Sequence, residues 1–177
     1  MQQKLFDIKP MRVTRPTAYT IESEDIYSKI AERIVDWDNS IKIEEAIKDL
    51  KETFSIWELV NSDGYEISRS FERHRGYRPD SQLVEEADSF CWIVREIVDN
   101  AVKKWVVDCQ ITPKFSVGDI VKFKPDNVSE VDGIIKGIDI NEARYTISPI
   151  SEKNNTRGYV INFEDVEEDF FDSKHWS

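Results

Sequence analysis

The stretch KKWVVDCQITPKFSVGDIVKF, residues 103–123, contains the point at which the periodicity of the sequence changes. Before it, apolar residues recur at the three- and four-residue spacing of amphipathic helices. After Pro113, β-branched and aromatic residues alternate with polar ones, which is typical of half-buried strands. This order predicts an α+β fold, with a helical domain over residues 1–110 and a strand domain over residues 111–177. The joining segment QITPK is short, so we expect the two domains to pack together.

The N-terminal domain is expected to be a bundle of about four helices. Apolar stripes predict them over residues 23–38, 40–54, 64–75 and from 81 to about 106. Asp63 and Glu66 have the spacing of a capping pair. Gly76 suits the left-handed position at a helix end, and Asp80 or Ser81 can cap the last and longest helix. An irregular arm is expected over residues 1–20.

Four strands are predicted in the C-terminal domain, over residues 119–124, 133–140, 143–149 and 158–163. The segments FSVGDIVKF, DGIIKGIDINEARYTI and GYVINFEDVE occur in the order seen in small SH3-like β-barrels. The close, EDVEEDFFDSKHW, resembles that of barrels in uncharacterised bacteriophage and mobile-element proteins. The resemblance covers about a third of the chain and implies a small SH3-like antiparallel β-barrel. Such barrels bind proteins, nucleic acids or nothing known, so the fold alone does not assign a function.

Composition places the chain among soluble proteins of a reducing cytoplasm, here that of a bacterial host cell. Nine Phe, six Tyr and five Trp can build a core, and no apolar run is long enough to cross a bilayer. The N-terminal residues lack the apolar segment of a signal peptide. Cys91 and Cys109 are too few for a disulfide framework. A net charge of −11 favours basic partners and repels nucleic acid at long range.

Against this acidic background the stretch RSFERHRGYRPD, residues 69–80, is an arginine island. A helix that ends near Gly76 explains most of it, because cations favour the negative end of a helix dipole. The density of arginine also fits a site for nucleic-acid phosphates, or for the carboxylates of the acidic helix at 40–58 of the same or another chain. The candidate residues of this site are Arg69, Arg73, Arg75, Tyr77 and Arg78.

An acidic run near the C-terminus is the second candidate site. It can be an ordinary solvated surface after the last strand. It can also bind a basic partner protein, with nearby aromatic side chains as anchors, since aromatic residues are enriched in binding hot spots. The candidate residues of this partner-binding patch are Glu164, Asp165, Glu167, Glu168, Asp169, Phe171 and Trp176.

Signatures of catalysis are weak in this sequence. It has no glycine-rich phosphate loop and no nucleophile elbow. The two histidines and two cysteines lack the spacing of a zinc site. Glu130 and Asp132, shortly after Asp126, have the carboxylates of a metal-dependent nuclease, but the lysine expected after the second carboxylate is missing. We therefore predict no enzyme, no catalytic or metal-ligating residue and no cofactor.

These features predict a non-enzymatic acidic protein of a phage or mobile element that binds and inhibits a host protein. A nucleic-acid-handling protein is the expected target, and an anti-restriction or anti-CRISPR role fits this profile. The alternative is a nucleic-acid-binding accessory protein that uses the arginine island. Neither the partner nor the oligomeric state follows from the sequence.

Overall fold

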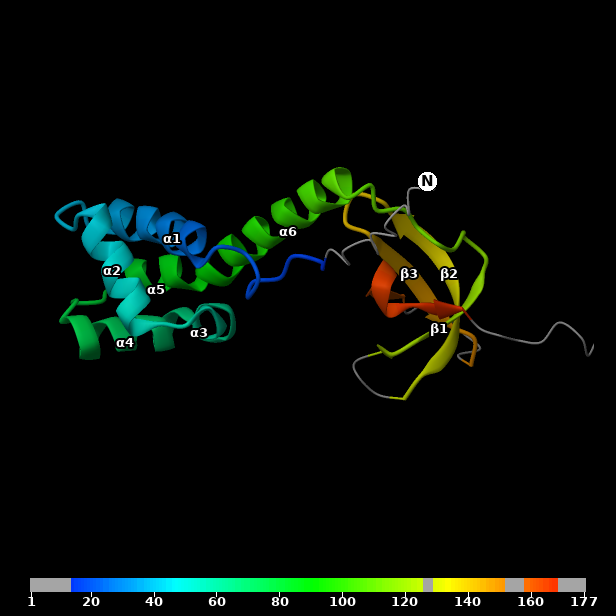
Figure 1. Ribbon diagram of the computed structural model, residues 1–177. Helices are drawn as coiled ribbons and strands as arrows, with labels where there is room; N and C mark the ends of the chain where they lie inside the picture. Colours follow the sequence, from blue (N-terminus) through cyan, green and yellow to red (C-terminus); the bar gives the residue numbers. More distant parts are fainter. Residues whose placement is uncertain (1–13, 126–128, 152–157, 169–177) are drawn as a thin grey trace, which may run out of the picture. The chain divides into compact units, whose positions relative to one another are not determined.

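The computed structural model describes residues 14–125, 129–151 and 158–168 of the chain. Within these ranges helices come first and strands follow, which confirms the α+β class (Figure 1). None of the described helices is both long enough and apolar enough to cross a membrane.

The described residues form six α-helices rather than about four. They are α1 (Ser23–Trp37), α2 (Ile43–Thr53), α3 (Ile56–Asn61), α4 (Gly64–Arg75), α5 (Ser81–Asp88) and α6 (Phe90–Asp108). The short α3 is a helix of its own because Ser55 and Glu58 form a capping box: each side chain accepts a hydrogen bond from the other's backbone N–H.

A break at Ser89 divides the segment for which the sequence predicts one long helix. The Ser89 hydroxyl donates a hydrogen bond to the backbone carbonyl of Glu86 at 2.6 Å. This side-chain bond uses a carbonyl of the last turn of α5. The neighbouring Asp88 carboxylate accepts the backbone N–H of Gly64 at 2.6 Å. The prediction of a continuous helix was wrong because apolar periodicity does not register these two hydrogen bonds, one within the chain segment and one to a residue 24 positions away.

Both expected ends of α4 and the expected start of α5 are confirmed. The Asp63 side chain caps α4 by accepting the N–H of Glu66 at 2.8 Å. Gly76 ends α4 in the left-handed region at φ 71°. Asp80 caps α5 by accepting the N–H of Leu83 at 2.9 Å, and it also accepts the Trp37 indole N–H at 3.1 Å.

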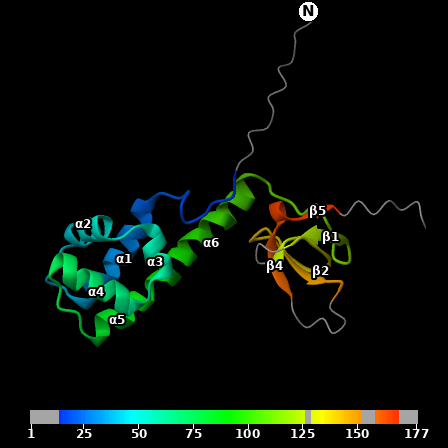
Figure 2. The same cartoon turned by 90° about the horizontal axis from the view of Figure 1, so that it is seen from below.

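The first compact unit, residues 1–101, has a core assembled from the apolar stripes of α1 to α6 (Figure 2). Its completely buried large side chains include Ile26, Ile30, Ile34, Leu50, Leu59, Ile67, Phe71 and Phe90. The isoleucines of α1 are spaced by four residues, which places them on one face of that helix. The core therefore follows the predicted periodicity even though the helices are more numerous.

Helix α4 packs against α5 through its smallest residue. A Cβ atom at Gly64 would lie 2.1 Å from the carbonyl oxygen of Val84 and 2.7 Å from the backbone nitrogen of Asp88. Both are backbone atoms, which cannot move aside as a flexible side chain can. Only glycine permits this approach of the two helices.

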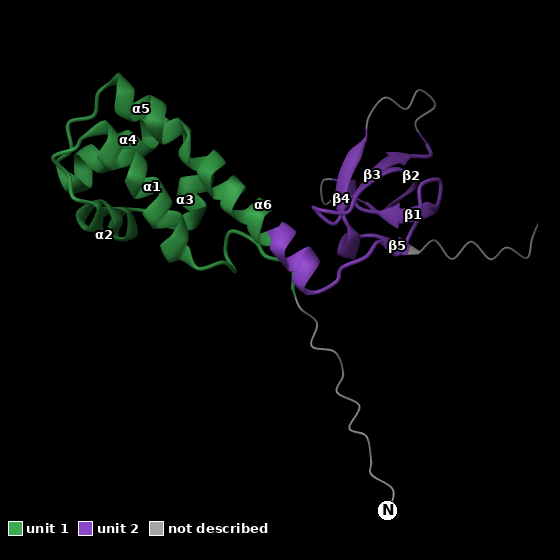
Figure 3. Ribbon diagram, turned by 90° about the horizontal axis from the view of Figure 1, so that it is seen from above, with its two compact units in different colours: residues 1–101 green, residues 102–177 purple. Residues whose placement is uncertain are grey.

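The second compact unit, residues 102–177, contains an open antiparallel sheet (Figure 3). Its strands are β1 (Ile120–Phe123), β2 (Val131–Asp139), β3 (Arg144–Pro149), β4 (Tyr159–Asn162) and β5 (Glu167–Glu168), in the order β4-β3-β2-β1-β5. A 3₁₀ turn, η2 (Phe163–Asp165), separates β4 from β5. The four predicted strands are confirmed and β5 is an addition. The sheet is not closed, because β4 and β5 are both edges.

Tyr145 on β3 is the central side chain of this unit. It is completely buried, and its ring lies 4.4 Å from that of Phe163, centroid to centroid. Its hydroxyl accepts the backbone N–H groups of Lys114 at 2.9 Å and Phe115 at 3.1 Å. One residue therefore fixes the segment that leads into β1 and the turn that follows β4.

We predict that Gly64→Ala lowers the free energy of unfolding by about 2 kcal/mol, because the added Cβ forces the α4 and α5 backbones apart. The control is Gly76→Ala, where nothing lies within 4 Å of the added Cβ and only the left-handed conformation is penalised, at about 1 kcal/mol. Urea denaturation followed by circular dichroism at 222 nm compares the two variants. A Gly64 variant as stable as wild type would contradict the close helix contact.

Candidate functional site

The arginine island is divided by the structure, and Arg75 faces the protein itself. Its Nε donates to the Thr53 hydroxyl at 2.9 Å and lies 3.5 Å from the Asp49 carboxylate. Its Nη2 lies 2.8 Å from the carboxylate of Glu52. The Arg75 side chain is only 20% exposed. Its guanidinium therefore holds the end of α4 to the acidic helix α2 of the same chain.

Tyr77 takes part in the same connection. Its hydroxyl donates to the second oxygen of the Asp49 carboxylate at 3.1 Å. Its ring stacks on that of Phe71, with 4.9 Å between the ring centroids and 12° between the planes. The Trp37 ring is tilted by 33° to it, with 6.1 Å between the centroids. Burial, and then the Asp49 charge, raise the pKa of the Tyr77 hydroxyl well above its ordinary value. The ring is half-buried and packs against the core, and Phe71 occupies the face that it stacks on.

Arg69 and Arg73 lie on the exposed side of α4. The Nε of Arg69 lies 3.6 Å from a carboxylate oxygen of Glu72. The guanidinium carbon of Arg69 lies 6.0 Å from the centre of the Tyr65 ring. Arg78 is separate from both and lines a different hollow, beside Trp37. The five residues of the predicted site thus do not form one surface.

A groove of about 610 Å³ between α3 and α4 brings the exposed arginines together with two aromatic side chains that the sequence analysis missed. Trp57 is 59% exposed and Tyr65 is 60% exposed. Trp57 belongs to an apolar run, which reads as core in the sequence. Because α3 has only six residues, it buries one of them, Leu59, and leaves Trp57 outside. We call this surface, defined by Trp57, Tyr65, Arg69 and Arg73, the α3–α4 groove.

The acidic run occupies the turn and the strand at the end of the sheet. Glu164 and Asp165 lie in η2, and Glu167 pairs with Lys122 across the β1–β5 ladder. Glu168 pairs with Val121 in the same ladder. Three members of the predicted patch, Asp169, Phe171 and Trp176, lie outside the described residues.

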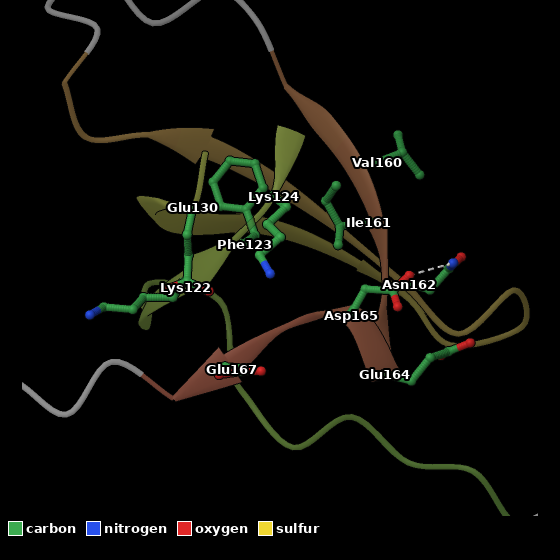
Figure 4. Close-up of a pocket in the computed structure, with 10 residues that line it drawn as sticks. All are labelled: Lys122, Phe123, Lys124, Glu130, Val160, Ile161, Asn162, Glu164, Asp165 and Glu167. Atoms are coloured by element: carbon green, nitrogen blue, oxygen red, sulfur yellow. Dashed lines mark hydrogen bonds between the residues drawn. The ribbon is translucent and has the colours of Figure 1, made fainter. Parts of the chain in front are cut away.

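Glu164, Asp165 and Glu167 border a cleft of about 370 Å³ on the open side of the sheet (Figure 4). One wall is β4, where Val160 and Ile161 leave the strand on opposite sides. Phe123 supplies an apolar side chain on the other wall. Charged groups at the cleft are Glu130, Glu164, Asp165 and Glu167 together with Lys122 and Lys124, a net charge of −2. We call this site the acidic cleft.

One of these carboxylates, Glu130, was not predicted as part of the acidic site. Glu130 appeared only as a loop residue of a discarded nuclease pattern, yet it lies at the cleft. Asp165 accepts a hydrogen bond from the Asn162 amide at 2.9 Å, which orients its carboxylate beside β4. The signal available in the sequence was the acidic run itself. The fold adds Glu130 and the lysines because it returns β5 to β1.

Among residues 14–125, 129–151 and 158–168, no three His, Cys, Asp or Glu side chains are grouped to hold a metal ion. No protein-family model, curated protein or solved structure matches this chain. The acidic cleft and the α3–α4 groove are therefore the candidate functional sites.

We predict that Arg75→Ala lowers the free energy of unfolding by about 2 kcal/mol, because it removes charged hydrogen bonds and leaves the Asp49 carboxylate without its cation. Arg73→Ala, two residues away on the exposed side of α4, should change it by less than about 0.5 kcal/mol. Urea denaturation of both variants measures the difference. If Arg75→Ala lowers the free energy of unfolding no more than Arg73→Ala does, the contact between Arg75 and α2 contributes no stability.

Proposed function

We propose that this protein is a non-enzymatic binding protein whose acidic cleft takes a lysine- or arginine-rich segment of a partner protein. The observation that carries the proposal is the composition of the cleft. Its four carboxylates outnumber two ammonium groups, and its two walls also carry the apolar side chains of Phe123 and Ile161. Lysine and arginine side chains have long apolar stems and charged ends. Their stems can contact the apolar side chains of the cleft while their charged ends meet its carboxylates.

The charge of the whole chain supports the same class of partner. A net charge of −11 accelerates encounter with a basic surface and disfavours nucleic acid. Proteins that handle nucleic acid carry basic surfaces of this kind. The proposed target is therefore a nucleic-acid-handling protein of a bacterial host, and the proposed setting is inhibition by a phage or mobile element, as in anti-restriction or anti-CRISPR action.

An SH3-like architecture of the sheet is part of this proposal. It is supported by the four-strand meander and by the return of β5 to β1 after the turn η2. The open side between β4 and β5 is where the acidic cleft lies. On this view the missing closure is what provides the binding site.

We predict that the double variant Glu164→Lys/Glu167→Lys binds a lysine-rich peptide about tenfold more weakly than wild type, because two attractive contacts become repulsive. The control is Glu85→Lys/Glu96→Lys, which changes the net charge equally at exposed helix positions. Fluorescence anisotropy with a labelled lysine–glycine peptide, at low and high salt, measures both. Equal loss in the two variants would mean that total charge, and not the cleft, binds the peptide.

The natural partner can be sought with the same pair of variants. Wild type and both double variants serve as baits in a nuclease-treated bacterial lysate. The proposal expects a protein that wild type and the control retain and the cleft variant loses.

A second function, binding of single-stranded nucleic acid, is favoured by one observation. The α3–α4 groove places two exposed aromatic rings, Trp57 and Tyr65, beside the guanidinium groups of Arg69 and Arg73. Aromatic rings stack on bases and arginines contact phosphates. This function ranks second because Glu58 and Glu66 line the same groove and the chain is acidic.

If this second function holds, Trp57→Ala/Tyr65→Ala should weaken binding of an oligothymidine by at least about tenfold, since each lost stack is worth about 1–3 kcal/mol. The matched control is Trp92→Ala. Trp92 is also exposed and also lies beside an arginine, with Arg95 4.9 Å from its ring centre, but it is on α6. Gel-shift titration compares the variants. Absence of oligothymidine binding by wild type would remove nucleic acid as a ligand of the groove.

A further inference from the structure

The outer edge of β4 has backbone groups directed away from the sheet. In the described residues β4 pairs only with β3. The N–H of Phe163 donates to the carbonyl of Ala143 at 2.9 Å, continuing the register of the two strands. Hydrogen-bonded and non-hydrogen-bonded pairs alternate along an antiparallel ladder. Tyr159 and Ile161 therefore bond to β3, whereas the N–H and carbonyl of Val160 point to the open edge.

This edge borders the acidic cleft. Val160, Ile161 and Asn162 of β4 line the cleft together with the carboxylates of η2 and β5. The Val160 side chain is 64% exposed, and no described strand pairs with this edge of β4. An exposed edge next to concentrated negative charge combines two separate recognition elements. The edge recognises an extended backbone, and the carboxylates recognise basic side chains.

We propose that the partner's basic segment binds as an extended strand along the edge of β4. This inference rests on the proposed function of the acidic cleft and specifies how the cleft works. In an added strand, every second side chain points to the same face. Lysine or arginine at alternate positions then meets Glu164, Asp165 and Glu167, while the backbone pairs with Val160.

Charge complementarity selects this occupant over a second copy of the chain. A second copy that paired through its own β4 would bring its own carboxylates to the same place. Like charges across an interface are strongly unfavourable. A basic segment of another protein removes this repulsion and also neutralises the excess negative charge of the cleft.

Val160→Pro separates strand addition from simple charge attraction. Proline removes an N–H that points to the open edge and leaves the β4–β3 hydrogen bonds in place, so an edge strand tolerates it. Val160→Thr is the matched control because it changes the side chain and keeps the N–H. The probe is a short peptide of alternating lysine and valine, and a second version carries N-methyl groups on alternate residues along one backbone edge.

Strand addition predicts that Val160→Pro binds the peptide at least about tenfold more weakly than wild type, with Val160→Thr within about twofold. One of the two possible N-methylation patterns should weaken binding to wild type to a similar degree. Amide hydrogen exchange at Val160 should slow when the peptide binds. The N-methyl and exchange measurements use wild-type protein, so they decide the question even if Val160→Pro folds poorly.

Unchanged binding by a folded Val160→Pro variant, together with insensitivity to N-methylation, would overturn strand addition. If the cleft variant Glu164→Lys/Glu167→Lys still loses the peptide in that case, the proposed function stands and only its mode is wrong. Failure of wild type to bind the peptide at all would overturn the proposed function and this inference with it. Wild-type self-association that Val160→Pro abolishes would make a second copy the occupant of the edge instead.

Discussion

The approach of α4 to α5 at Gly64 is the constraint on which the helical unit depends. Because no Cβ separates the helices, the Gly64 N–H reaches the Asp88 carboxylate, and α5 ends beside it. The same contact fixes the rotation of α4 about its axis. Ile67 and Phe71 then point into the core, and the opposite face of the helix is left for Tyr65, Arg69 and Arg73. A contact between backbones thus determines which side chains can meet a ligand.

The polar contacts of Arg75 and Tyr77 act on the other end of α4. Both reach the same carboxylate, Asp49, from positions on either side of Gly76. A left-handed residue turns the chain there, so a helical residue and a residue beyond the helix can converge on α2. The dense arginine of this stretch consequently has two explanations. Arg75 serves the fold, whereas Arg69 and Arg73 remain on the surface.

Local signals in the sequence were sufficient for much of the fold. The change at Pro113 predicted the α+β class, and the four strands and the caps at Asp63, Gly76 and Asp80 followed from alternation and from turn chemistry. Sequence patterns failed where a residue's partner is distant. The two-residue strand β5 depends on its pairing with β1, and the break at Ser89 depends in part on the contact of Asp88 with Gly64. Trp57 points outward because α3 is only six residues long. The apolar composition of this segment gives no sign of such a short helix.

The candidate sites show the same division between local and distant information. Sequence located the acidic run, because carboxylates close together in the chain remain close in space. It could not locate the cleft, which requires Glu130, Lys122 and Lys124, residues in or next to strands that pair only in the folded sheet. The sequence also could not show that Arg75 is structural while Arg73 is exposed. The two arginines lie on the same helix, and they differ only in that α2 packs against Arg75.

Charge and strand geometry have separate tasks in the proposed mode of binding. A net charge of −11 attracts basic proteins in general and does not distinguish among them. Discrimination has to come from a feature with directional requirements, and an open strand edge is one. It accepts a segment only if the segment is extended, has free N–H groups and carries its basic side chains at every second position. A helical or proline-rich basic surface satisfies the charge and fails the geometry. An acidic protein can in this way be selective for a basic partner although most of its attraction is non-specific.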